Sequence, residues 1–143
     1  MGLLDLGAMP PKVSPSASVM DAVKRMMSER VGAIAVTEGR RLLGVFTERD
    51  LMMRVVGKGL DPAATPIGEV MTRNVHTVRD ETSVAEAAAL MRANHFRHLP
   101  VVDEHGEIQG MVALRFLLYA LMDKYENKVD DLERFLMEDS RGG

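Results

Sequence analysis

The sequence predicts an α+β fold built from two copies of one structural unit. Residues 18–36 (SVMDAVKRMMSERVGAIAV) align without a gap on residues 83–101 (SVAEAAALMRANHFRHLPV), at an offset of 65 residues. In each copy, apolar residues at helical spacing are followed by a short β-rich run. This offset is too long for a solenoid repeat and too short for an average domain, so we expect one compact body with pseudo-twofold symmetry.

Composition narrows the classes of function that the chain can serve. The 143 residues include 18 basic and 21 acidic side chains, which are mixed along the sequence and give a net charge of −3. This balance does not indicate binding to nucleic acid or to an anionic membrane surface. The chain has no cysteine, which excludes disulfides, thiolate catalysis and cysteine-ligated zinc.

The N-terminus and the apolar segments predict a cytoplasmic protein without membrane association. The opening sequence MGLLDLGAMPPK lacks the basic start of a signal peptide, and Asp5 interrupts its apolar run. The most apolar stretch, FLLYALM, is far shorter than the roughly 20 residues that a membrane-spanning helix needs.

Each copy is predicted to run strand, helix, strand, strand, helix. A first strand is expected at residues 12–15 and 76–80. The first helices follow Ser18 and Ser83, which are N-cap candidates with an acidic residue three positions later, the spacing of a capping box. The runs AIAV and HLPVVD then begin two short hairpins, each with a glycine in its turn.

The second helices of the two copies are expected to begin near Glu48 and Leu114. A segment rich in glycine and proline separates the copies and is predicted to be a linker. The predicted organisation has four parts: a first repeat (8–58), a linker (59–66), a second repeat (67–122) and a C-terminal helical extension (123–143).

The two copies differ in chemistry where the second hairpin ends. GVFTERDL at residues 44–51 carries Thr47 and Asp50, whereas GMVALRFLL at residues 110–118 carries Ala113 and Phe116 in their places. A Thr-x-x-Asp sequence at a strand-to-helix turn can be a capping box that stabilises the helix by about 0.5–2 kcal/mol. It can also bind a ligand, because a carboxylate accepts hydrogen bonds from both hydroxyls of a ribose.

The repeated order of these short motifs resembles a tandem pair of CBS domains, often called a Bateman module. The resemblance covers roughly residues 8–122 and is carried by VGAIAV and LLGVFTERDL in the first copy and by IGEVMTRNVHTVRDETSVAEAAALMRANHFRHLPVVDEHGEIQGMV in the second. It implies a pseudo-twofold disc with two clefts. In this family such clefts commonly hold AMP, ADP, ATP, S-adenosylmethionine or dinucleotides.

The resemblance also implies which residues would line the ligand site. The family signature of Gly, two apolar residues, Ser or Thr, two variable residues and Asp marks the ribose site, and GVFTERD fits it at every position. The second copy does not fit, so we expect one competent cleft and one weak or filled cleft. The candidate ligand-binding residues are Val45, Thr47, Arg49, Asp50, Asn74, His76, Arg97 and His98.

These features favour a regulatory module over an enzyme. The sequence lacks the GxSxG and HExxH motifs, and no carboxylate pair has an evident catalytic setting. His95 and His98 have no third ligand at a matching spacing, so we expect no metal site and no required cofactor. The expected function is sensing of an adenosine nucleotide and signalling to a separate protein effector. The alternative is a structural, dimerising or protein-interaction module without a small ligand.

The last part of the chain predicts a contact surface. Its apolar residues alternate at spacings of four and three, the a/d pattern of a coiled coil, and they are Leu118, Met122, Tyr125, Val129, Leu132 and Leu136. The pattern is shorter than the three to four heptads that identify a coiled coil by themselves. The alternatives are a homodimer contact and an amphipathic helix packed on the protein's own body.

Overall fold

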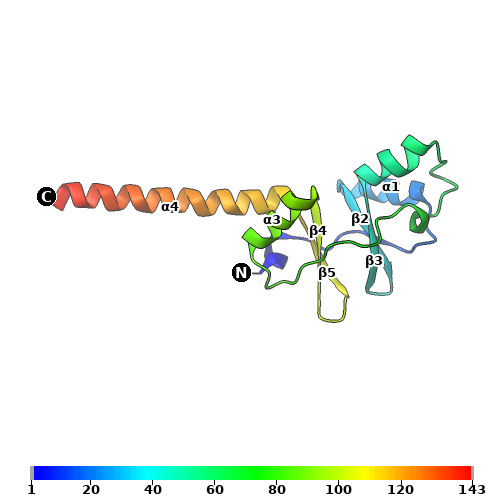
Figure 1. The fold of residues 1–143 in the computed structure, drawn as a ribbon, viewed down its shortest axis with the longest axis horizontal. Helices are drawn as coiled ribbons and strands as arrows, with labels where there is room; N and C mark the ends of the chain where they lie inside the picture. The colour runs from blue at the N-terminus through cyan, green and yellow to red at the C-terminus, as the bar shows by residue number, and fades with distance from the viewer. Residues whose placement is uncertain (1, 143) are drawn as a thin grey trace.

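The computed structural model describes the backbone of residues 2–142 and the side chains of residues 2–137. Two hairpins stand next to each other in a small body, each with a helix beside it, and a single long helix extends from that body (Figure 1). The helices are α1 (Val19–Glu29), α2 (Glu48–Asp50), α3 (Val84–Asn94) and α4 (Leu114–Gly142). The strands are β1 (Lys12–Val13), β2 (Ala33–Glu38), β3 (Arg41–Thr47), β4 (His98–Val102) and β5 (Ile108–Ala113).

The first helix of each repeat begins where the sequence predicts. The Ser18 hydroxyl accepts a hydrogen bond from the Asp21 amide at the start of α1, and Ser83 does the same for Glu86 at the start of α3. The reciprocal half of the predicted capping boxes is absent, since neither acidic side chain returns a bond to its serine amide. Each serine therefore caps its helix with a single hydrogen bond.

Both predicted hairpins are present. β2 pairs antiparallel with β3, β4 pairs antiparallel with β5, and the turns carry Gly39 and Gly106 at positive φ. The first predicted strand exists as β1, which runs parallel to β2. Its counterpart at residues 76–80 is reduced to one parallel bridge between Val78 and Val101. The fold is α+β, as predicted.

The second helices of the two repeats differ strongly in length and regularity. α2 covers only Glu48–Asp50 and continues as a wider π-type segment, η2 (Leu51–Val55), and a 3₁₀ turn, η3 (Val56–Lys58). α4 instead runs on without a break through the position where a separate C-terminal extension was expected to begin. The second helix of repeat 2 and the predicted extension are therefore one continuous helix.

The segment that leads into each repeat packs on the other repeat. Ala8 exchanges two backbone hydrogen bonds with Met111 of β5, and Thr72 exchanges two with Val45 of β3. The same holds for two 3₁₀ turns, because η1 (Leu3–Leu6) places Leu3 in the apolar core of repeat 2, and η4 (Ile67–Glu69) places Ile67 in that of repeat 1. This reciprocal exchange ties the two repeats together.

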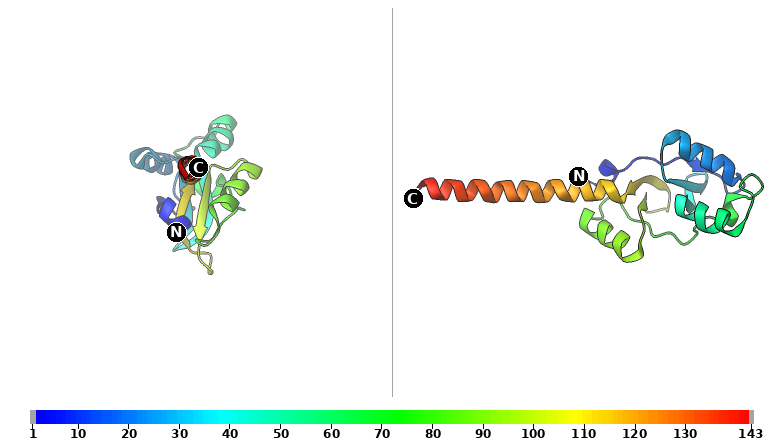
Figure 2. Two further views of the ribbon diagram at one scale, coloured as in Figure 1. Left: turned by 90° about the vertical axis from the view of Figure 1, so that its left-hand side faces the viewer. Right: turned by 90° about the horizontal axis from the view of Figure 1, so that it is seen from above.

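The apolar core is divided into three clusters. One lies within repeat 1 around Ile34 and Phe46, and one lies within repeat 2 around Leu99 and Leu117. The third cluster joins Ala33 and Val45 of repeat 1 to Met111 of repeat 2, so the repeats share a buried contact. Viewed from above, the long helix leads away from this body in one direction (Figure 2).

Candidate functional site

The turn between β3 and α2 holds the two residues that distinguish the first repeat. The Thr47 hydroxyl accepts a hydrogen bond from the Asp50 amide at 3.3 Å, and the Thr47 amide donates to Asp50 Oδ2 at 3.0 Å. This is a complete capping box, because both residues satisfy a backbone group that the helix start would leave unpaired. The local interpretation of the Thr-x-x-Asp sequence is therefore confirmed as one of its roles.

Asp50 has further partners that the sequence did not indicate. The Thr72 hydroxyl donates to Asp50 Oδ1 at 3.1 Å, and Arg54 Nε lies 3.6 Å from the same oxygen. The residue is only 8% exposed. Thr72 comes from the segment leading into repeat 2, so the exchange described above carries it to the first repeat's turn. No spacing in the sequence relates Thr72 to Asp50.

In repeat 2, the two positions that correspond to Thr47 and Asp50 carry no polar side chain. Ala113 and Phe116 take the two positions, and the Phe116 ring is 44% exposed. That ring lies 6.3 Å from Tyr119, edge to face, and the Arg115 guanidinium lies 5.0 Å above it. This turn presents an aromatic surface where repeat 1 presents a carboxylate.

The remaining candidate residues outside the two clefts come from repeat 1 and from the segment leading into repeat 2, and most of them lie on the surface. Asn74 and His76 are exposed, and the His76 ring lies 5.3 Å from Phe96. Val45 is buried in the cluster shared by the two repeats. Arg49 is exposed and donates to the Met53 sulfur at 3.5 Å.

A first cleft of about 750 Å³ opens between α1, the start of α2, the start of β4 and the start of α4. Its charged and titratable lining residues are Arg30, Glu48, Arg97, His98 and Arg115. Gly32 also lines it, and a Cβ there would lie 3.3 Å from Glu48 Cδ and 3.4 Å from His98 Cε1. Glycine thus keeps this point open, and basic residues outnumber the single carboxylate around it.

His98 is the titratable group of this cleft whose environment is most clearly altered. Burial lowers its pKa below the ordinary value of 6.5, and Arg115 and Arg97 lower it further. Glu48 acts in the opposite direction but does not overcome the burial. The imidazole is therefore held mainly neutral at pH 7, with the guanidinium groups of Arg97 and Arg115 and the carboxylate of Glu48 acting on it.

A second cleft of about 900 Å³ lies beside the start of α4 and also reaches residues 31–33 of repeat 1. It is lined by residues 5–10, by Phe116 and Tyr119, and by Asp123, Lys124 and Asn127 of α4. It shares Val31, Gly32, His98, Ala113 and Arg115 with the first cleft, so the two openings meet near the hairpins. A filled second cleft was one expectation from the sequence; the structure shows this cleft open.

The candidate residues fall into separate groups in the structure. Arg97 and His98 line the first cleft, whereas Thr47, Asp50, Asn74 and His76 line neither of the two clefts. Among the described residues, no group of three or more potential metal-ligating side chains gathers in one place, and no helix is long and apolar enough to cross a membrane.

Comparison with known proteins relates this architecture to a family. Residues 7–57 and 67–123 each match the sequence profile of the CBS domain. CBS domain-containing protein CBSCBSPB3 of Arabidopsis thaliana is 33% identical over 129 residues, which are 88% of this chain but only 23% of the plant protein's length.

Two solved structures share the fold over most of the length of both chains. A protein with CBS domains from Burkholderia ambifaria is 34% identical, with a TM-score of 0.77 over 83% of this chain and 87% of that one. A CBS domain protein from Pyrobaculum aerophilum, solved in complex with AMP, is 28% identical, with a TM-score of 0.73 over 81% of this chain and 89% of that one.

Proposed function

The chain belongs to the CBS domain family as a tandem pair, and from this premise we propose that it is a regulatory module that binds an adenosine nucleotide between its repeats. The nucleotide would be AMP, ADP, ATP or a related molecule such as S-adenosylmethionine. Binding would be reported to a separate protein effector, and we expect the module to act as a homodimer. The AMP complex of the Pyrobaculum aerophilum relative supports this choice of ligand class.

The observation that carries the proposal is the buried carboxylate of Asp50 in the first repeat alone. A carboxylate can accept about four hydrogen bonds, and those to charged or polar donors are among the stronger ones in proteins. Thr47 and Asp50 hold the turn because the side chain of each accepts from the backbone amide of the other, whereas Thr72 and Arg54 contact Asp50 only through their side chains. Ribose hydroxyls would replace these side-chain partners while the cap stays in place.

The phosphate end of the ligand would face the basic side chains of the first cleft. Arg97 is exposed there, and its planar guanidinium matches two phosphate oxygens at once. A nearby phosphate would also favour protonated His98, whose pKa is lowered in the free protein. Asn74 and His76 would contact the base, and Arg49 would add charge beside the turn.

Calorimetric titration of the full chain with AMP, ATP and S-adenosylmethionine tests the proposal. We expect one tight site per chain, since repeat 2 has no carboxylate at Phe116. Asp50→Asn keeps the shape and one oxygen but loses the charge, and we expect it to weaken binding on the order of a hundredfold. Asp21→Asn, which removes an exposed carboxylate from α1, is the matched control and should bind like the wild type.

The result also depends on the fold being retained, so thermal denaturation by circular dichroism accompanies each titration. Undiminished binding by folded Asp50→Asn would contradict the ribose assignment. Two equal sites per chain would show that Phe116 does not disable the second cleft.

One observation favours the alternative of a structural or interaction module without a ligand. Both oxygens of the Asp50 carboxylate already have partners within the chain, and among the described residues no buried polar side-chain atom lacks one. A site that is fully satisfied internally does not require a ligand. If none of the three compounds raises the melting temperature at millimolar concentration, this alternative is the better description.

A further inference from the structure

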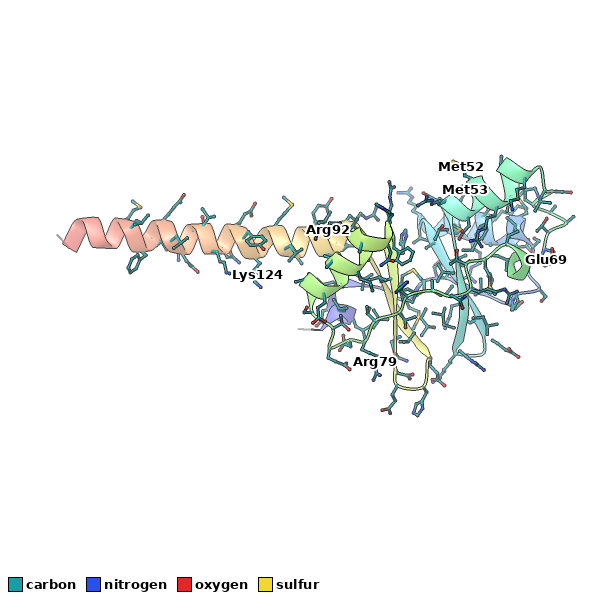
Figure 3. All side chains as sticks on the ribbon, viewed as in Figure 1. Met52, Met53, Glu69, Arg79, Arg92 and Lys124 are labelled. Carbon is teal, nitrogen blue, oxygen red and sulfur yellow. The ribbon has the colours of Figure 1, made fainter. Side chains whose placement is uncertain are left out.

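The apolar stripe of α4 is uncovered in the structure. Its members are each between 45% and 63% exposed, and they are Leu118, Met122, Tyr125, Val129, Leu132 and Leu136. The alternative that this helix packs on the protein's own body is therefore wrong for the stripe. Beyond Lys124 the helix continues as a single rod, and no other element of the described part of the chain lies beside it (Figures 1 and 3).

The helix contacts its own body through a different set of side chains. Leu117 is fully buried in the core of repeat 2, and Leu114 packs against that core. Leu118 follows Leu117 by one position, which places it about 100° further around the helix. The body thus fixes the start of α4. Leu118 lines the first cleft, and the later members of the stripe line neither of the two clefts.

The stripe is long enough to need a partner. From Leu118 to Leu136 it covers 19 residues of helix, roughly 27 Å at 1.5 Å per residue. Monomeric soluble proteins rarely leave such a continuous apolar surface in water, and a projecting helix draws most of its stability from burial of its apolar face.

We propose that α4 forms a parallel two-stranded coiled coil with α4 of a second copy of this chain. The spacing assigns Met122, Val129 and Leu136 to heptad position a, and Leu118, Tyr125 and Leu132 to position d. A β-branched residue at a followed by leucine at d, as in Val129 and Leu132, is typical of parallel dimers. This inference concerns assembly and does not rest on the nucleotide site.

The charges beside the stripe favour the parallel orientation. In a parallel pair, position g of one helix lies beside position e five residues later on the other. Lys128 is at g and Glu133 is at e, so each dimer would form this attractive pair twice. In an antiparallel pair, e positions face e positions, which would bring Glu126 and Glu133 of the two chains together and repel them.

The absence of cysteine makes the orientation directly measurable. Val129→Cys places one thiol on the seam of each chain, and a parallel coiled coil in register brings the two thiols together. We expect mild oxidation to link most of this variant into covalent dimers. Asp130→Cys is the matched control, because position b faces away from the partner and should remain mostly unlinked.

Exchanging the charges of Lys128 and Glu133 tests the parallel orientation without a disulfide between the helices. Lys128→Glu should weaken the dimer roughly tenfold in sedimentation equilibrium, because two attractive pairs become repulsive. Adding Glu133→Lys in the same chain should restore the affinity. An antiparallel dimer would show no such rescue.

Three results would overturn the proposal: a full-length chain that is monomeric at micromolar concentration, a Val129→Cys variant that stays reduced although the protein is dimeric, and equal linkage of Val129→Cys and Asp130→Cys. The nucleotide titration reads out Asp50, and the substituted positions 128, 129, 130 and 133 line neither cleft, so failure of one proposal leaves the other standing.

Discussion

At the scale of single residues, Asp50 combines a structural and a proposed binding role in one carboxylate. The capping box with Thr47 fixes the side chain at the start of α2, so a ligand would meet an acceptor that is already oriented. The hydrogen bond from Thr72 adds a link to the second repeat. Any change of this residue therefore affects both the helix start and the contact between repeats, which is why asparagine is a better test than alanine.

His98 predicts a pH dependence of stability. Burial lowers its pKa below 6.5 in the folded protein, so between these two pKa values the unfolded chain holds more protons than the folded one. The free energy of unfolding should therefore be highest above pH 6.5 and fall as the pH is lowered. Urea denaturation between pH 7.5 and pH 5 measures this loss of stability. The two ends of this range lie about one pH unit or more from 6.5, the ordinary pKa of histidine.

The control for this prediction is His98→Gln, which cannot be protonated in this range. The decrease between the two ends of the pH range should be smaller in the variant than in the wild type. An equal decrease in both proteins would show that other groups cause it.

At the scale of elements, the exchanged leading segments explain why glycine precedes the apolar pair in each second hairpin strand. A Cβ at Gly44 would lie 2.6 Å from the backbone oxygen of Thr72 and 2.7 Å from the Met71 sulfur. A Cβ at Gly110 would instead meet the tip of the Leu4 side chain at 2.8 Å. Both glycines allow the exchanged segments to approach closely. An added Cβ would clash with a backbone atom at Gly44, but only with the end of a flexible side chain at Gly110.

The two glycines should therefore respond differently to the same change. Gly44→Ala should lower the free energy of unfolding by about 2 kcal/mol, because the Thr72 backbone and with it the contact to Asp50 must shift. Gly110→Ala should cost less than about 1 kcal/mol, since Leu4 can change rotamer. Chemical denaturation followed by circular dichroism compares them, and an equal loss in both variants would refute this explanation.

At the scale of the whole molecule, the repeats should unfold as one unit. They share the cluster of Ala33, Val45 and Met111, and each contributes a leading segment to the other. The two tyrosines lie in α4, so far-ultraviolet circular dichroism and calorimetry report on the body better than intrinsic fluorescence does. We expect a single calorimetric transition, and two resolved transitions would show that the repeats are independent.

The shared cluster can be weakened selectively. Met111 is 8% exposed, and Met111→Ala should lower the free energy of unfolding by about 2 kcal/mol because it leaves a cavity between the repeats. Met27 is 73% exposed, so Met27→Ala is the matched control and should change stability by less than about 0.5 kcal/mol. An equal effect of the two changes, measured by urea denaturation, would contradict the role of this cluster.

The sequence by itself determined the elements that depend on local chemistry. The repeat, the caps at Ser18 and Ser83, the glycine turns and the Thr47–Asp50 box follow from residues within a few positions of one another, and the structure confirms them. The α+β class and the family followed from their order.

Only the tertiary structure decided what distant segments do to each other. The exchange that brings Thr72 to Asp50, the open cleft of repeat 2 and the exposure of the α4 stripe arise from contacts between residues far apart in sequence. The spacing of apolar residues along a helix is the same whether the stripe packs on the protein's own body or on a partner. The direction in which the stripe faces depends on how Leu117 packs in the core of repeat 2. The periodicity of the sequence does not determine this packing.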